Sequence, residues 1–258
     1  MKILLTNDDG IEAPGLEALC RELGGEHECL VAAPAIEQSA SSHSISLSQK
    51  LLIEEKGPRR YAIHGTPADC VKLALSEIKD FKPDLLISGI NPGPNTGVSV
   101  YYSGTISAAR EALINRLPGI AVSIRSRVPS DYSFAASFCH VLIEGYEKGH
   151  FPRDVILNVN IPDLPESKIR GIKIARQAPS RFVEEFIVDS LHNHKRTYRL
   201  AGEIQVFDPD GTTDEEVSSQ GFISLSPLKL DLTCYATVPL LEKWLKQRKH
   251  SWQRQKGT

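Results

Sequence analysis

The sequence predicts an α/β fold with a doubly wound, Rossmann-like and mostly parallel sheet. Short apolar runs alternate with helical patterns through the first 165 residues, which is the rhythm of strand, crossover helix and parallel strand. The apolar runs are continuous rather than alternating, as expected for strands that are covered on both faces. A chain of 258 residues is also long enough to bury one large core.

Local patterns predict the individual elements. Strands are expected at residues 2–6, 28–33, 84–88, 119–124 and 155–161. Between the first two strands, Leu16, Leu19 and Leu23 recur at helical spacing and form one apolar face. Thr66 and Asp69 have the spacing of a capping box, which predicts the start of a second helix. Apolar residues at 134, 138, 141 and 142 predict a third.

Two segments depart from this rhythm. Residues 44–63 contain short β-like pieces punctuated by Gly57 and Pro58, and they predict a β-hairpin excursion. We expect one domain over residues 1–258, with a core at about 1–165 and a C-terminal extension at about 166–258. The extension has strand-like pieces at 171–175, 197–200 and 221–226, followed by a helical run with Leu240, Leu241, Trp244 and Leu245. The polar, basic residues 246–258 predict a frayed, solvated tail.

Composition limits the classes of partner. The 30 basic residues nearly balance the 32 acidic ones, so no global basic field attracts a nucleic-acid polymer or an anionic membrane. The five cysteines are scattered and contain no C-x-x-C pair, which disfavours a disulfide framework or a zinc site. No export or anchoring segment is recognisable, and we expect a cytoplasmic protein.

The residues beyond the first two predicted strands are candidates for chemistry, because open parallel sheets bind ligands at their carboxyl edge. Asp8 and Asp9 follow the first strand, and two adjacent carboxylates repel each other unless a cation lies between them. A turn or a helix cap is the alternative interpretation of this motif. Ser39 and His43 lie in a serine-rich loop after the second strand. His43 is a candidate acid or base, a phosphate contact, or only a hydrogen-bonded histidine.

The loop after the third core strand, residues 91–97, is rich in glycine and proline, so backbone and short amide side chains can approach a ligand closely. Thr105 is predicted to cap a helix beginning near Ile106, and the free amides of such a helix start form a phosphate site. Sequence fingerprints of P-loop, dinucleotide-binding and nucleophile-elbow enzymes are absent, which disfavours those classes. A haloacid-dehalogenase-type phosphatase is also disfavoured, because its two carboxylates lie two residues apart.

Seven motifs together carry a resemblance to a known family. They are Thr-Asn-Asp-Asp-Gly-Ile at 6–11, Ala-Pro at 33–34 with Gln-Ser-Ala at 38–40, His-Ser-Ile at 43–45, Gly-Thr-Pro-Ala-Asp-Cys-Val at 65–71, Ser-Gly-Ile-Asn at 88–91 with Gly93, Tyr-Ser-Gly-Thr at 102–105, and Leu-Asn-Val-Asn-Ile-Pro at 157–162. In order and spacing they resemble the SurE survival-protein family of metal-dependent 5′/3′-nucleotidases. Ser42 departs from the pattern, since the family usually has glycine there.

The resemblance implies a set of ligand-binding residues. One divalent cation would be held by Asp8, Asp9, Ser39 and Asn91. The substrate phosphate would be surrounded by Asn95, Ser103, Gly104 and Thr105. Carboxylate, hydroxyl and amide oxygens are hard donors, which favours Mg²⁺ or Mn²⁺ over a metal that prefers thiolates.

The activity that the resemblance implies is hydrolysis of nucleoside monophosphates to nucleoside and phosphate, a 5′-nucleotidase activity that extends to 3′-nucleotides and polyphosphate. Asp8 or Asp9 is the candidate base for the attacking water, and His43 is the candidate acid for the leaving oxygen. The alternative is a non-catalytic nucleotide or polyphosphate sensor on the same scaffold. Exchange of C-terminal segments between subunits is also implied, and we expect a homodimer or a tetramer.

Overall fold

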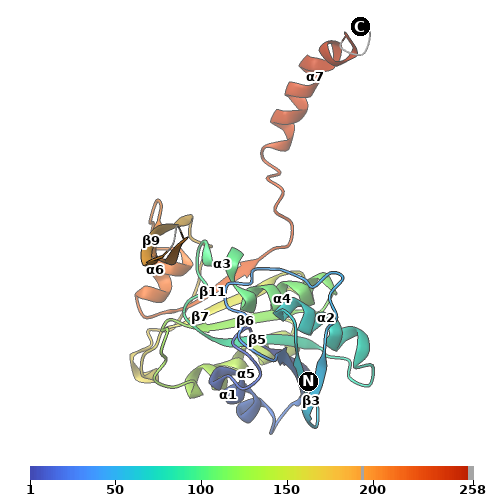
Figure 1. Ribbon diagram of the computed structural model, residues 1–258, viewed down its shortest axis with the longest axis vertical. Helices are drawn as coiled ribbons and strands as arrows, with labels where there is room; N and C mark the ends of the chain where they lie inside the picture. Colours follow the sequence, from blue (N-terminus) through green and yellow to red (C-terminus); the bar gives the residue numbers. More distant parts are fainter. Residues whose placement is uncertain (193–194, 255–258) are drawn as a thin grey trace. The chain divides into compact units, whose positions relative to one another are not determined.

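The computed structural model describes residues 1–192 and 195–254, and it divides the chain into two compact units, Met1–Leu228 and Lys229–Thr258. The first unit is built on one large sheet (Figure 1). The second contains helix α7 (Val238–Arg254). The residues predicted as a frayed tail are helical as far as Arg254, so that prediction is wrong there, and residues 255–258 lie outside the described part of the chain.

The central sheet of the described residues has nine strands in the order β3-β4-β2-β1-β5-β6-β7-β11-β8. Their bounds are β1 (Lys2–Thr6), β2 (Glu28–Pro34), β3 (Ile53–Gly57), β4 (Arg60–Ile63), β5 (Leu85–Pro92), β6 (Gly119–Ile124), β7 (Ile156–Ile161), β8 (Ile172–Ile174) and β11 (Ile223–Leu228). Neighbouring strands are parallel except where β3 meets β4 and β11 meets β7. The predicted mostly parallel sheet is confirmed.

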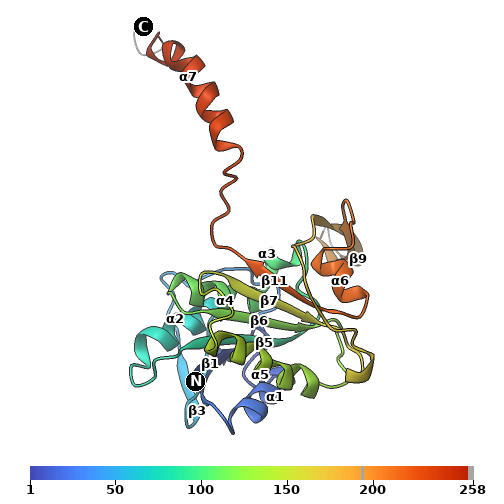
Figure 2. The ribbon, with the colours of Figure 1, turned by 180° about the vertical axis from the view of Figure 1, so that it is seen from behind.

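Helices cover both faces of this sheet (Figures 1 and 2). Their bounds are α1 (Pro14–Leu23), α2 (Pro67–Glu77), α3 (Ser99–Tyr102), α4 (Gly104–Ile114), α5 (Ser133–Glu147) and α6 (Asp214–Ser219), with a 3₁₀ turn at Glu166–Lys168. Buried residues of α1 and α5 belong to one apolar cluster, and those of α2 and α4 belong to the other. The predicted face of Leu16, Leu19 and Leu23 is fully buried. The fold is therefore doubly wound, as predicted.

The predicted excursion is present and extends the sheet. Strands β3 and β4 form an antiparallel hairpin, and β4 pairs in parallel with β2. At the other end, β11 pairs with β7 and β8 pairs with β11. The central sheet therefore includes strands from the segment expected to be an extension. Strand β5 continues to Pro92, beyond its predicted end at 88, with an irregularity between Ser88 and Asn91.

A separate two-stranded sheet is formed by β9 (Ser180–His192) and β10 (Lys195–Val206). The sequence indicated a strand at 197–200, but it gave no strand for β9. Both strands carry many exposed side chains. Among the described residues, no helix has the length and apolar character needed to cross a membrane.

The two predicted helix starts have different outcomes. At α2 the capping box is confirmed, because Thr66 Oγ1 accepts from the Asp69 amide at 3.2 Å and Asp69 Oδ2 accepts from the Thr66 amide at 2.9 Å. Helix α4 is capped by Ser103 rather than Thr105, since Ser103 Oγ accepts from the Ile106 amide at 3.1 Å. The predicted cap is wrong because the Thr105 hydroxyl donates a hydrogen bond to Asp8 instead.

Candidate functional site

A cleft of about 670 Å³ opens where residues that follow β1 and β2, and residues at the end of β5 and after it, meet the β9–β10 hairpin. Six of the predicted site residues line it, namely Asp8, Asp9, Ser39, Asn91, Asn95 and Ser103. The sheet explains why they meet. Strand β1 lies between β2 and β5, so the chain order diverges on either side of it, and ligands bind at such switch points.

Asp8 is buried against the start of α4. Its Oδ1 accepts a hydrogen bond from Thr105 Oγ1 at 2.6 Å, and the backbone amides of Gly104 and Thr105 also donate to the carboxylate. A Cβ at Gly104 would lie 2.6 Å from Asp8 Cβ, so only glycine permits this approach. Burial raises the pKa of Asp8 above its ordinary value, although these hydrogen bonds oppose the shift.

Two of the predicted phosphate contacts, Gly104 and Thr105, lie against Asp8 instead of lining the cleft. Thr105 is completely buried, and neither Thr105 nor Gly104 lines the cleft. Both instead hold the carboxylate of Asp8. Contact of these two residues with the substrate phosphate stays a prediction.

Asp9 lies between two other carboxylates and is only partly exposed. Burial, and the negative charges of Asp8 and Glu37, raise the pKa of Asp9 to about 7. Its Oδ2 is buried and has no hydrogen-bond partner among the described residues. A buried carboxylate oxygen without a partner is costly, and a cation beside it would remove that cost.

Ser39 and Asn91 complete a set of oxygen donors. Ser39 Oγ donates to Glu37 Oε1 at 2.5 Å, which leaves its lone pairs available. Asn91 Nδ2 donates to the Gly93 carbonyl at 2.6 Å, so its amide nitrogen is engaged and Oδ1 is left to accept or to bind a cation. The four residues therefore fit a hard divalent cation in both chemistry and charge.

Side chains of β7 form hydrogen bonds with the loop that carries Asn95. The Asn95 amide donates to Asn160 Oδ1 at 2.7 Å, and Asn158 Nδ2 donates to the Asn95 carbonyl at 2.8 Å. Asn95 Nδ2 donates to Ser123 Oγ of β6 at 2.9 Å. These partners were not among the predicted site residues. Two asparagines at alternate positions of one buried strand share a face, and this pattern could have indicated that they contact a loop at the site.

Helix α6 fixes the same loop from the other side, and nothing in the sequence pattern pointed to it. Both carboxylate oxygens of Asp214 accept from the Gly97 amide, and Glu215 Oε2 accepts from Thr96 Oγ1 at 2.5 Å. Glu215, which also lines the cleft, pairs with Arg125. Hydrogen bonds to Arg125 and Thr96 hold the pKa of Glu215 below its ordinary value despite its burial.

His43 is not brought into the cleft. Its Nε2 lies 2.9 Å from Glu111 Oε2, and Glu111 is a buried residue of α4. The other oxygen of that carboxylate binds Lys72 Nζ at 2.8 Å. The contact fastens the serine-rich loop to α4. The role of His43 as leaving-group acid stays a prediction, because this geometry does not place the imidazole beside a substrate.

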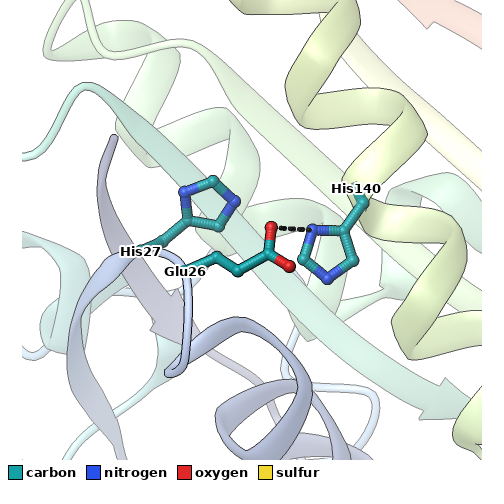
Figure 3. A group of neighbouring side chains, drawn as sticks. All are labelled: Glu26, His27 and His140. Atoms are coloured by element: carbon teal, nitrogen blue, oxygen red, sulfur yellow. Dashed lines mark ion pairs between the residues drawn. The ribbon is translucent and has the colours of Figure 1, made fainter.

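A second group of potential metal ligands lies elsewhere, at Glu26, His27 and His140 (Figure 3). The Glu26 carboxylate lies between the two rings, and one ligand atom from each residue falls within 4.8 Å of the others. Each histidine has other polar neighbours, because His140 lies 3.7 Å from Glu26 and 3.5 Å from Glu22, and His27 Nδ1 lies 3.3 Å from the Met1 amine. None of these residues lines the cleft.

Comparisons with known proteins point to one family. A family model described as survival protein SurE matches residues 3–184. The 5′-nucleotidase SurE of Desulfatibacillum aliphaticivorans is 41% identical over 95% of this chain and 98% of its own. The 5′-nucleotidase SurE of Moorella thermoacetica is 43% identical over 95% of this chain and 96% of its own.

A solved structure extends the likeness to the fold. The crystal structure of the SurE protein from Aquifex aeolicus superposes with a TM-score of 0.84 at 35% sequence identity, covering 95% of this chain and 100% of that one. The chain belongs to the SurE survival-protein family.

Proposed function

We propose that this chain is a metal-dependent 5′-nucleotidase that hydrolyses nucleoside monophosphates to nucleoside and phosphate. The observation that carries the proposal is the adjacent pair Asp8 and Asp9 at an open cleft beside the start of α4. One buried oxygen of Asp9 has no hydrogen-bond partner in the part of the chain that the structure describes. Family membership and relatives named 5′-nucleotidase support the same activity.

Asp8, Asp9, Ser39 and Asn91 would hold one divalent cation, and their oxygen donors favour Mg²⁺ or Mn²⁺. When bound, the cation supplies Lewis acidity that polarises the phosphoryl group. The chain's own residues supply the rest. Asn95 and Ser103 line the cleft and orient the phosphate. The Ser103 oxygen already accepts from the Ile106 amide, so its O–H is available to donate to a phosphate oxygen.

Asp9 is the better placed of the two candidate bases. Asp8 is engaged by Thr105 and by the α4 amides, whereas no other described residue donates a hydrogen bond to the Asp9 carboxylate, which can offer Oδ2 to the cation and its second oxygen to the water. In the reaction the water oxygen bonds to phosphorus, and the bond from phosphorus to the leaving ribose oxygen breaks. The water proton passes to the Asp9 carboxylate, and the leaving oxygen takes up a proton from solvent as the nucleoside departs.

Phosphate release tests the proposal. The protein should hydrolyse nucleoside monophosphates with Mg²⁺ or Mn²⁺ and lose this activity in excess chelator. Asp9→Asn should lose activity and divalent-cation affinity together, by more than the roughly 10- to 100-fold that outer-shell changes cost. Asp80→Asn, at an exposed carboxylate in the loop after α2, is the matched control and should behave as the unaltered protein.

Two results would contradict the proposal. One is full activity in chelator, which would remove the cation from the reaction. The other is nucleotide binding without phosphate release under any metal, which would favour the sensor. Parallel assays with 3′-nucleotides and with polyphosphate define the range of substrates.

We further propose that the chain works as a homodimer, or as a tetramer of paired dimers, in which part of the C-terminal segment is exchanged between subunits. The supporting observation is the exposure of large apolar side chains within Lys229–Thr258. They are Leu230, Leu232, Tyr235, Val238, Leu240, Leu241, Trp244 and Leu245. Apolar surface on this scale is normally covered by a partner.

A further inference from the structure

The cleft is lined by two sets of residues with unlike chemistry. One set is acidic and polar and includes the proposed cation and phosphate ligands. The other comes from the base of the β9–β10 hairpin and consists of Phe182, Gly202, Glu203 and Ile204. At about 670 Å³ the cleft falls within the range of roughly 300–1,000 Å³ found for whole small-molecule sites, so it has room for more than a phosphate.

Phe182 and Ile204 form a single apolar surface on the hairpin. They are directly opposed partners in the antiparallel ladder of β9 and β10, and opposed residues project from the same face. Both are only partly exposed, and both line the cleft.

Gly202 lies close to the phenyl ring of Phe182 and has no side chain that could cover it. A Cβ at this position would lie 2.1 Å from the Val183 carbonyl oxygen and 3.1 Å from Phe182 Cε1. The backbone φ of +141° is also one that residues with a side chain rarely adopt. Glycine at position 202 therefore lets β10 approach the Val183 carbonyl of β9 closely, and the Phe182 ring stays open to a ligand.

This wall is unsuited to a second anion. None of Phe182, Gly202 and Ile204 carries a positive charge for a phosphate, and Glu203 adds a negative charge to the same stretch of β10, whereas a neutral aromatic ring can stack on Phe182. Stacking on aromatic side chains is how proteins hold nucleobases of differing sequence.

We propose that Phe182, supported by Ile204, binds the nucleobase of the substrate and makes the enzyme favour nucleotides over phosphate esters that lack a base. This inference rests on the proposed nucleotidase function and assigns a residue that discriminates between substrates. Phe182 acts on recognition, whereas the residues around Asp8 and Asp9 act on the phosphoryl group.

The test compares AMP with ribose 5-phosphate, which carries the same phosphate and sugar but no base. In Phe182→Ala the ratio of kcat/KM for AMP to kcat/KM for ribose 5-phosphate should fall about 5- to 150-fold, the range that one stacked base supplies. Phe182→Trp should preserve the ratio. Phe186→Ala is the matched control, because Phe186 is on the same strand and exposed but does not line the cleft.

An unchanged ratio in Phe182→Ala would overturn the proposal. If that unchanged ratio came with an equal loss on both substrates, it would indicate a structural role for Phe182. The same fall in Phe186→Ala would also overturn it. If the unaltered protein releases no phosphate from any nucleotide, the nucleotidase function fails separately. Calorimetric binding of AMP and ribose 5-phosphate then gives the ratio for the same variants, and the base-binding proposal is decided by that ratio.

Discussion

Helices α1 and α7 both present an apolar stripe at helical spacing, but the stripe is buried in α1 and exposed in α7. In α1, Leu16, Leu19 and Leu23 are completely buried. In α7, Leu240 is 66% exposed and Leu241 is 56% exposed. The pattern that makes a helix amphipathic is thus independent of what covers its apolar face. For α1 the cover is the sheet of its own unit, and for α7 we propose a second copy of the chain.

The largest effect should come from removing α7. A chain ending at Thr237 lacks Leu240, Leu241, Trp244 and Leu245, whose burial is worth roughly 6 to 12 kcal/mol before the cost of ordering. We expect the truncated chain to sediment as a monomer at micromolar concentration while the full chain sediments as a dimer or tetramer. The far-ultraviolet spectrum of the truncated chain should keep the signal of the α/β unit.

Two outcomes would contradict the proposal that a second copy of the chain covers α7. A monomeric full chain would mean that α7 is covered within its own subunit or not at all. Unchanged assembly of the truncated chain would place the interface elsewhere, and the exposed apolar residues of the β9–β10 hairpin would then be the next surface to test.

The second effect in size is on α1. Leu19→Ala should lower the free energy of unfolding by about 2 to 5 kcal/mol, because it removes buried methyl groups and leaves a cavity. Urea denaturation measures this loss, which should be the same at low and high protein concentration, since the cover of α1 is intramolecular. A loss that depends on protein concentration would contradict the distinction between the two helices.

The corresponding change in α7 should act on association. Leu241→Ala should raise the dissociation constant of the assembly roughly 10- to 150-fold, as expected for about 1.5 to 3 kcal/mol of lost burial. Sedimentation equilibrium over a dilution series measures it. Lys243→Ala, two positions along the same helix, is the control and should leave the constant nearly unchanged; equal effects of both variants would point to a change in helix stability instead.

The smallest effect concerns a helix start. Thr66→Ala removes the capping box of α2 and should cost about 1 kcal/mol of stability. Ser76→Ala, at an exposed position near the end of the same helix, should change the stability by less than about 0.5 kcal/mol. Thermal unfolding of the two variants side by side separates the cap from a general effect of substitution, and a Thr66→Ala protein as stable as the Ser76→Ala protein would show that the cap contributes nothing.

The sequence was most informative where a pattern is local or periodic. Buried strands such as Gly119–Ile124 are continuous apolar runs, and the Thr66 cap has a fixed spacing, so both could be predicted. The strand ends also indicated Asp8, Asp9 and Asn91, because parallel strands deliver their carboxyl ends to one edge.

The missed features depend on contacts between distant segments. Thr105 is a plausible cap by type, but Asp8, 97 positions away, takes its hydroxyl, and the helix begins at Gly104 instead. Likewise His43 has the chemistry of an acid, yet a buried carboxylate on α4 binds its ring. Phe182 reaches the cleft only because the hairpin folds over it, which no local pattern reveals.

The close contact between Gly104 and Asp8 has a consequence for how the site can change over evolutionary time. A methyl group at position 104 would lie 2.6 Å from the Cβ of Asp8 and 2.8 Å from its Oδ2, so the glycine is required by this close approach rather than by the helix that it begins. Every residue except glycine has a Cβ at position 8, so replacing the aspartate alone would not make room for a larger residue at 104. We therefore expect glycine at position 104 wherever the end of β1 packs this closely against the start of α4, whichever residue a relative carries at position 8.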